Sequence, residues 1–263
     1  MQQENEQMKY VKFTKEDKAI IMKSLEEQHF ETFISYFRNT ELLVECQYML
    51  THSLQKLAPT ENAEFQVGNR HYYVKITDMI KIRINNEWAA FIKGHIYYRA
   101  QDVQNYKQDF PKLNECTSKD LFLTDQTEWF ISTTFLQKIQ VKPIDEYNIL
   151  TIELNDEYYT RAEYNTQEQK FNPPISEWIT YCFCKKLYNP REHYIQCNQC
   201  NQWVHYSCSD RSDKELKIIS ELKFICFQCV EENKNNKLNL QDNENQDGQL
   251  TKLNTTIQVN KKK

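Results

Sequence analysis

The sequence predicts a multidomain α+β protein with four successive parts: a helical N-terminal segment, a β-rich domain, a small zinc-held module and a disordered polar tail. Three observations support this prediction. Apolar residues recur at helical spacing near the N-terminus, short aromatic and apolar runs follow, and seven of the nine cysteines then fall within one stretch. The expected boundaries are 1–58, 62–172, 179–231 and 232–263.

The N-terminal segment is expected to hold two helices. Thr14 and Asp17 resemble a capping box, and apolar residues follow at roughly helical spacing. These residues are Ile20, Ile21, Leu25 and Phe30. A second helix is expected to begin near Asn39. Its apolar positions would be Leu42, Leu43, Cys46, Met49, Leu50 and Leu54. We interpret both stripes as packing surfaces rather than as sites.

The next segment reads as strands. Runs such as "HYYVKI", "MIKIRI" and "WAAFIKGHIYYR" are short, aromatic and separated by turn residues, which is typical of a β-rich domain. The connector "NPPISEW" is stiff because each proline restricts itself and the residue before it. After Cys229 the chain has almost no aromatic or periodic apolar content, so the tail is predicted to be disordered.

Composition limits the functional class. The formal net charge is −4 and the pI is about 5.9, which argues against a protein held mainly by nucleic-acid phosphates and favours a basic peptide partner. Direct DNA binding stays possible but is not expected to be primary. The polar N-terminus and the lack of a long apolar run predict no secretion signal and no membrane span, hence an intracellular protein.

The cysteine-rich stretch predicts two structural zinc ions. It supplies eight ligands in the order four Cys, one His, three Cys, which suits two closed tetrahedral shells with no open position for a catalytic water. If successive ligand pairs along the chain alternate between the two zinc ions, the metals hold so small a segment together as one folded unit. The first zinc is assigned to Cys182, Cys184, His205 and Cys208, and the second to Cys197, Cys200, Cys226 and Cys229. Cys46 and Cys116 are expected to be buried apolar residues.

Residues 181–230 resemble a PHD finger, a reader of histone tails. The resemblance rests on the ligand order, on Trp203 two residues before His205, and on Phe224 two residues before Cys226. A RING finger, which would imply a ubiquitin ligase, usually has its His at the fourth ligand rather than the fifth. No paired carboxylates, nucleophile motif or phosphate loop stands out, and the chain has only 3 glycines, so we expect a binding module and not an enzyme.

The finger is similar to the subgroup that reads trimethylated lysine 4 of histone H3. The cage positions of that subgroup fall on Tyr181, Tyr188, Tyr194 and Trp203. A trimethylammonium has no hydrogen-bond donors, so aromatic faces must attract it. As an alternative, these rings cover the metal sites or pack on a neighbouring domain. Asn198 and Gln202 stand where the subgroup often has acidic residues, which puts the contact with an arginine of the tail in doubt.

Residues 62–172 resemble a BAH domain. The segments "HYYVK", "IYYRAQD", "DLFLTD" and "YYTRAEY" occur in the family's order, and plant BAH-PHD chromatin readers carry a closely similar finger directly after their BAH domain. Some BAH domains hold a methyl-lysine cage, for which Tyr98 and its neighbour Tyr97 are candidates here. Ile96 stands at the usual Trp position, which favours a protein or nucleosome contact over methyl-lysine reading.

These resemblances together imply a nuclear, non-catalytic chromatin reader. Its expected partners are the H3 tail trimethylated at lysine 4 and subunits of a chromatin complex. The alternative is a scaffold subunit whose finger and BAH-like domain are protein interfaces without methyl-lysine reading.

Overall fold

The computed structural model describes residue 23 and residues 30–84, 86–104, 110–146, 156–209 and 223–235. The chain divides into two compact units, Met1–Trp178 and Ile179–Lys263. In these described ranges, none of the helices combines the length and the apolar character needed to cross a membrane.

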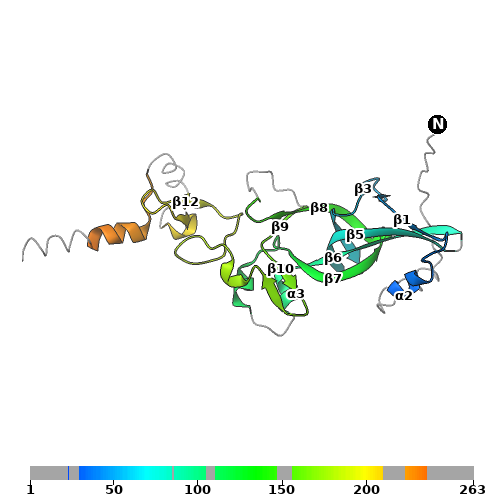
Figure 1. Ribbon diagram of the computed structural model, residues 1–263. Coiled ribbons are helices and arrows are strands. Elements are labelled where there is room, and N and C mark those ends of the chain that lie inside the picture. The colour runs from blue at the N-terminus through cyan, green and yellow to red at the C-terminus, as the bar shows by residue number, and fades with distance from the viewer. Residues whose placement is uncertain are drawn as a thin grey trace, which may run out of the picture. The chain divides into compact units, whose positions relative to one another are not determined.

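The first unit is built on one large sheet (Figure 1). Its strand order is β11-β10-β7-β6-β5-β4-β8-β9, and β1 pairs with β5 beside this path. The strands are β1 (Leu43–Glu45), β4 (Asn62–Val67), β5 (Arg70–Ile84), β6 (Glu87–Tyr98), β7 (Phe122–Ile131), β8 (Phe135–Pro143), β9 (Glu157–Thr160), β10 (Glu163–Asn165) and β11 (Lys170–Asn172). A separate pair consists of β2 (Met49–Leu50) and β3 (Lys56–Leu57).

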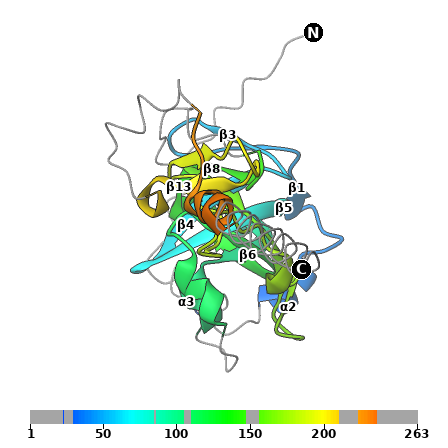
Figure 2. The same ribbon diagram turned by 90° about the vertical axis from the view of Figure 1, so that its left-hand side faces the viewer.

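The helices among the described residues of this unit are short. They are α2 (Phe30–Ser35), α3 (Ala100–Gln104) and the 3-10 turns η1 (Pro111–Glu115), η2 (Ser132–Thr134) and η3 (Ile175–Glu177). The long antiparallel strands β5 and β6 run through the middle of the sheet in both ribbon views (Figure 1, Figure 2). A Cβ added at Gly94 of β6 would overlap Val74 Cγ1 and the carbonyl oxygen of Lys75, so this close approach of the strands requires glycine.

Aromatic residues fill the core of the first unit. Phe65 of β4 stacks on Phe130 of β7 with a centroid distance of 4.8 Å, in a cluster that includes Met79 and Ile92. A second cluster forms where Phe30 and Ile34 of α2 pack on the other face of the sheet. The observed β-rich domain confirms this part of the predicted fold class.

Glu31 fixes α2 to the sheet. Its Oε1 accepts hydrogen bonds from Lys93 Nζ at 2.5 Å and from Trp129 Nε1 at 2.8 Å. These bonds outweigh the desolvation that would raise the pKa of Glu31, and the pKa is lowered as a result.

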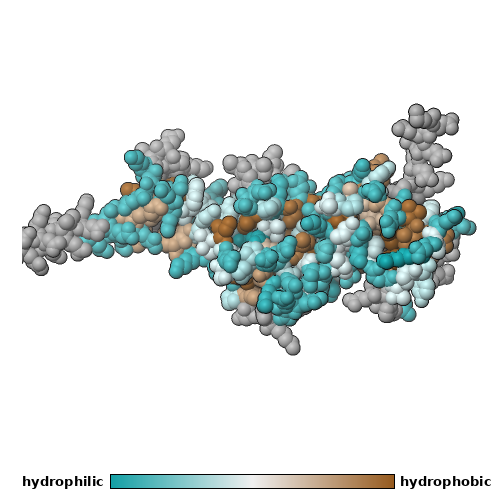
Figure 3. Space-filling view, viewed as in Figure 1, coloured by the Kyte–Doolittle hydropathy of each residue, from teal (hydrophilic) through white to brown (hydrophobic). Residues whose placement is uncertain are grey.

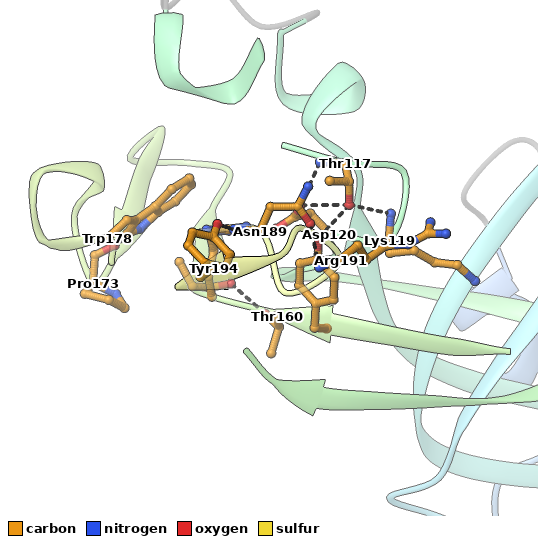
Figure 4. Close-up of polar contacts among 12 residues, drawn as sticks. Thr117, Lys119, Asp120, Thr160, Pro173, Trp178, Asn189, Arg191 and Tyr194 are labelled. Carbon is orange, nitrogen blue, oxygen red and sulfur yellow. Dashed lines mark hydrogen bonds and ion pairs between the residues drawn. The ribbon is translucent and has the colours of Figure 1, made fainter. Parts of the chain in front are cut away.

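A buried ion pair joins the loop before β7 to the segment after β9. Arg161 Nε donates to Asp120 Oδ1 at 2.6 Å, and the two side chains are 3% and 0% exposed. The Thr117 backbone N–H donates to the other oxygen of Asp120 at 2.7 Å (Figure 4). Because both carboxylate oxygens are paired, the buried charge is compensated.

The predicted second helix near Asn39 is wrong. Residues 43–57 form β1, β2 and β3, and both Asn39 and Leu54 have positive φ (70° and 59°), which a helix does not allow. The apolar positions fit a helix in sequence, but Leu43 pairs instead with Ile82 of β5. The sheet therefore begins before residue 62.

The first predicted helix lies largely outside the described residues, as do Thr14, Asp17, Ile20, Ile21 and Leu25. Phe30 is described and begins α2. From residue 236 on, the predicted disordered tail also lies outside the described residues. Residues 227–235 are helical, so the tail prediction is wrong for 232–235. This helix contains the ligand Cys229, and reciprocal side-chain hydrogen bonds between Asn233 and Gln199 fix it to the finger.

The two cysteines outside the finger are partly buried rather than fully buried. Cys46 packs beside the first core cluster. Burial raises the pKa of both thiols, that of Cys116 to about 12, so each stays protonated at neutral pH.

Candidate functional site

The second unit brings together the first predicted ligand set. Cys182, Cys184, His205 and Cys208 offer ligand atoms that all lie within 4.8 Å of one another. His205 Nδ1 lies 3.3 Å from Cys184 Sγ and 3.9 Å from Cys208 Sγ. A tetrahedral zinc with ordinary bond lengths separates such nitrogen and sulfur ligands by about 3.6 Å. The site therefore fits zinc.

The second predicted ligand set also fits zinc. Cys197, Cys200, Cys226 and Cys229 also offer ligand atoms within 4.8 Å of one another. Cys197 Sγ lies 3.9 Å from Cys229 Sγ, and Cys200 Sγ lies 3.8 Å from Cys226 Sγ. Tetrahedral Zn–S bonds place two sulfurs about 3.8 Å apart. The finger thus contains two cysteine-rich sites arranged for two zinc ions, and their four-ligand shells are structural in type.

Tight turns position these ligands. Cys182, Lys185 and Asn201 have positive φ values of 71°, 56° and 60°, which reverse the chain beside the ligand pairs. The backbone N–H groups of Gln199 and Cys226 point at Cys197 Sγ at 3.4 and 3.3 Å. Amide donors of this kind stabilise a thiolate, the form that binds zinc.

Glu192 contacts the ligand His205 from outside the metal site. Its Oε2 lies 3.3 Å from His205 Nε2, while Nδ1 faces the cysteines. The 3.3 Å separation is an ion-pair distance without hydrogen-bond geometry, and the nearby negative charge favours a proton on Nε2, which leaves Nδ1 free to bind metal. Burial lowers the pKa of His205, which also favours the neutral ring. Sequence reasoning missed Glu192, because no ligand spacing indicates such a partner.

Three of the four predicted cage residues are in mutual ring contact. The Tyr181 centroid lies 4.8 Å from that of Tyr188 and 5.9 Å from that of Tyr194, and the last two are 5.5 Å apart. The Tyr188 N–H donates to Ile179 O at 2.9 Å, which folds the chain back so that Tyr181 meets Tyr188. The Tyr194 hydroxyl accepts the Asn189 N–H at 3.0 Å (Figure 4).

Trp203 lies on the same face of a small hairpin as Tyr194. The hairpin consists of β12 (Tyr194–Gln196) and β13 (Trp203–His205), with Tyr194 opposite His205 and Gln196 opposite Trp203. Trp203 is therefore the diagonal neighbour of Tyr194, at roughly 7–8 Å between Cα atoms. Its side chain is 41% exposed, and within the described residues it does not join the ring contacts of the tyrosines.

The tyrosine rings leave no space between them for a cation. The middle of their triangle is about 3 Å from each centroid, which is closer than the ~3.5–4 Å at which carbon atoms make contact. A methylammonium group must therefore lie over the rings rather than among them. Burial raises the pKa of Tyr188 and raises that of Tyr194 to about 12, so both phenols are neutral at neutral pH.

The two amide residues near Trp203 are exposed. Their backbones hold the finger together: the Asn198 N–H donates to Phe224 O at 2.8 Å, and Gln202 O accepts the Cys197 N–H at 2.9 Å. Their side chains lie at the surface, and both residues are close to Trp203 in the sequence. An amide there offers an arginine a neutral hydrogen-bond acceptor instead of a charged carboxylate.

The first unit does not bring Tyr97 and Tyr98 to one site. Consecutive strand residues point to opposite faces. Tyr97 is buried and donates to Asn62 Oδ1 at 3.0 Å, whereas Tyr98 is partly buried on the other face and donates to Gln126 Oε1 at 2.6 Å. Ile96 is itself buried, at 7% exposure. These three positions therefore do not line a common pocket.

The PHD-finger family matches residues 182–229, the segment that carries all eight ligands. Two curated plant relatives are similar to this chain. The Arabidopsis thaliana "Chromatin remodeling protein SHL" is 28% identical over 119 residues, which are 45% of this chain and 49% of that protein. "Chromatin remodeling protein EBS" from the same plant is 29% identical over 112 residues, or 43% and 45%.

Each match thus spans about half the length of the curated relative. The chain is also similar to the crystal structure of the yeast Rsc2 BAH domain, with a TM-score of 0.37 and 12% identity over 49% of this chain and 54% of that one. Residues 182–229 thus form a PHD finger, and a little under half of the chain is similar to the two plant chromatin remodeling proteins.

Proposed function

We propose that this protein is a nuclear, non-catalytic chromatin reader whose PHD finger binds the N-terminal tail of histone H3 trimethylated at lysine 4. The observation that carries the proposal is the cluster of Tyr181, Tyr188 and Tyr194, with Trp203 on the same face as Tyr194. The chromatin remodeling names of the plant relatives favour a chromatin partner and a nuclear location.

Cation–π attraction supplies the recognition. A trimethylammonium group keeps its charge but has lost every N–H, so ring faces attract it while hydrogen-bonding sites do not. Each ring contributes about 0.5–2 kcal/mol, depending on how far the cation is desolvated. In the proposed complex the cation lies over the exposed side of the tyrosine cluster, and the half-exposed indole of Trp203 closes over it.

The tail would run along β12 and β13, which present Trp203 and Gln196 side by side. Asn198 and Gln202 would meet an arginine of the tail with amide oxygens. A neutral acceptor forms a weaker bond with a guanidinium than a carboxylate does, so the finger alone should bind modestly. The BAH-like domain would add a protein or nucleosome contact and raise the overall affinity.

Calorimetry with the full-length, zinc-loaded chain tests the proposal. An H3 tail peptide with trimethyl-lysine 4 should bind more tightly than the unmodified peptide, and Trp203→Ala should reduce that preference. Tyr36→Ala is the matched control, because Tyr36 is 77% exposed and lies outside the finger. Equal binding of the two peptides by the unaltered chain would reject the proposal.

A second candidate rests on the packing of the same rings. The Tyr194 ring lies 4.6 Å from that of the zinc ligand His205, as expected of an aromatic residue that covers a metal site. In this case the protein is a scaffold subunit of a chromatin complex without methyl-lysine reading. Retained chromatin association in the Trp203→Ala variant, together with no peptide preference in the unaltered chain, would favour it.

A further inference from the structure

The sheet of the first unit extends past its own core. Met79 of β5 and Ile92 of β6 are a cross-strand pair, 2% and 1% exposed, in the main core cluster. Beyond them on the same face come Lys81, then Arg83 opposite Trp88. On this face the buried core therefore ends at Met79 and Ile92, and the strands continue for several more residues toward their hairpin.

Strand β1 completes this extension. Val44 lies opposite Lys81, and the Arg83 N–H donates to Leu42 O at 2.7 Å. Alternation along the strands then places five side chains on one face. We call them the end face: Leu42, Val44, Lys81, Arg83 and Trp88.

The two faces of this extension differ. On one, Ile82 and Ala89 are fully buried beneath Phe30 and Ile34 of α2. On the end face, Leu42, Val44 and Trp88 keep 40%, 45% and 36% exposure. Figure 3 shows hydrophobic surface at the end of the sheet where β1 lies. Within the described ranges, α2 covers only the first of the two faces.

Two cations, Lys81 and Arg83, lie among the exposed apolar residues of the end face. In the part of the chain that the structure describes, neither Lys81 nor Arg83 makes an ion pair, whereas the nearby Lys93 is paired with Glu31. Two cations that have no ion-pair partner among the described residues, in a chain of net charge −4, favour an acidic ligand. Trp and Arg together are typical of interface centres.

We propose that the end face binds an acidic segment of a partner protein that carries an apolar anchor. Its carboxylates would pair with Lys81 and Arg83, and its apolar side chain would lie against Trp88, Leu42 and Val44. Exposed aliphatic side chains offer nothing to nucleic-acid phosphates, which makes DNA a poorer occupant. A second copy docked symmetrically would bring the same two cations face to face, which opposes self-association.

Fluorescence anisotropy with the full-length, zinc-loaded chain tests this proposal. The probe is a labelled peptide of about 12 residues that alternates Glu and Leu, and its counterpart alternates Lys and Leu. The acidic peptide should bind in a salt-dependent manner and the basic one should not. Lys81→Glu with Arg83→Glu should weaken binding about ten-fold or more, and Trp88→Ala should also weaken it.

Arg70→Glu is the control, because Arg70 is exposed at the opposite end of β5 and should leave binding unchanged. An unchanged thermal transition in each variant excludes misfolding as the cause. Equal binding of the two peptides, or unchanged binding after the Lys81 and Arg83 reversal, would overturn the proposal. The proposal would also be overturned if the same charge reversal abolished duplex DNA binding or dimer formation while binding of the acidic peptide stayed unchanged. Because the histone peptide assay does not involve this face, either proposal can fail alone.

Discussion

Tyr194 lies directly opposite His205 in the β12–β13 hairpin, with their ring centroids 4.6 Å apart. One is a proposed cage residue and the other a ligand of the first zinc site. The orientation of the cage ring thus depends on the strand that the metal holds. Zinc binding and peptide binding should therefore be coupled, although the proposed cage contains no metal ligand.

Removal of zinc should therefore abolish binding of the trimethylated peptide. The described residues of the finger form a small apolar cluster that includes the ligands Cys197, Cys226 and Cys229 themselves, so without metal the finger should unfold. Circular dichroism and calorimetry after chelation measure both effects. The sheet of the first unit should keep its own thermal transition, which serves as the internal control. Peptide binding that persists in verified metal-free protein would contradict this coupling.

Trp203→Ala should weaken binding of the trimethylated peptide by about 2- to 30-fold, the equivalent of the ~0.5–2 kcal/mol that one ring supplies. Stability should change little, because the indole is 41% exposed. Calorimetry gives the affinity, and a thermal scan monitors the fold. A variant with unaltered affinity would remove Trp203 from the cage.

Glu192→Gln should lower the zinc affinity of the first site, because the ring of His205 loses the carboxylate 3.3 Å from its Nε2. Loss of such an outer partner costs on the order of ten-fold in metal affinity, and the exposure of Glu192 favours the low end of the known range. Competition with a chromophoric chelator measures the affinity. Glu231→Gln, an exposed glutamate of the same unit, is the control. Identical zinc affinity in both variants would deny Glu192 this role.

Asp120→Asn should destabilise the first unit strongly. It leaves Arg161, whose side chain is 3% exposed, without its carboxylate partner, and breaking a buried pair in this way costs about 3–5 kcal/mol. Urea unfolding monitored by tryptophan fluorescence gives the free energy. Glu168→Gln removes the exposed ion pair between Glu168 and Lys170 and should change the free energy of unfolding by less than about 1 kcal/mol. Comparable losses of unfolding free energy in both variants would contradict the conclusion that burial makes the Asp120–Arg161 pair the more costly one to break.

The zinc ligands could be predicted from the sequence because each ligand pair is local and zinc accepts few donor types. The clustering of Tyr181, Tyr188 and Tyr194 was expected only through family resemblance, and the structure brings these rings into contact. Tyr97 and Tyr98 point to opposite faces because consecutive residues of a strand alternate. The sequence prediction did not use this alternation when it grouped the two residues in one site.

The region after Asn39 could not be predicted in the same way. Its apolar spacing suits a helix, but Leu43 pairs with Ile82, far along the chain, and this tertiary contact outweighs local preference. The contact between Glu192 and His205 likewise depends on how the finger folds around its metal sites, and no spacing rule indicates it. Motifs with local spacing were thus predictable, whereas elements fixed by distant partners were not.

The central claim is that aromatic rings bind the charge of the trimethyl-lysine. The most direct test compares the H3 peptide carrying trimethyl-lysine 4 with the same peptide carrying its neutral tert-butyl analogue, in which carbon replaces the quaternary nitrogen. Shape and apolar area are conserved, so calorimetry isolates the cation–π contribution. We predict that the charged peptide binds several-fold more tightly. Equal affinity for the two peptides would contradict the claim.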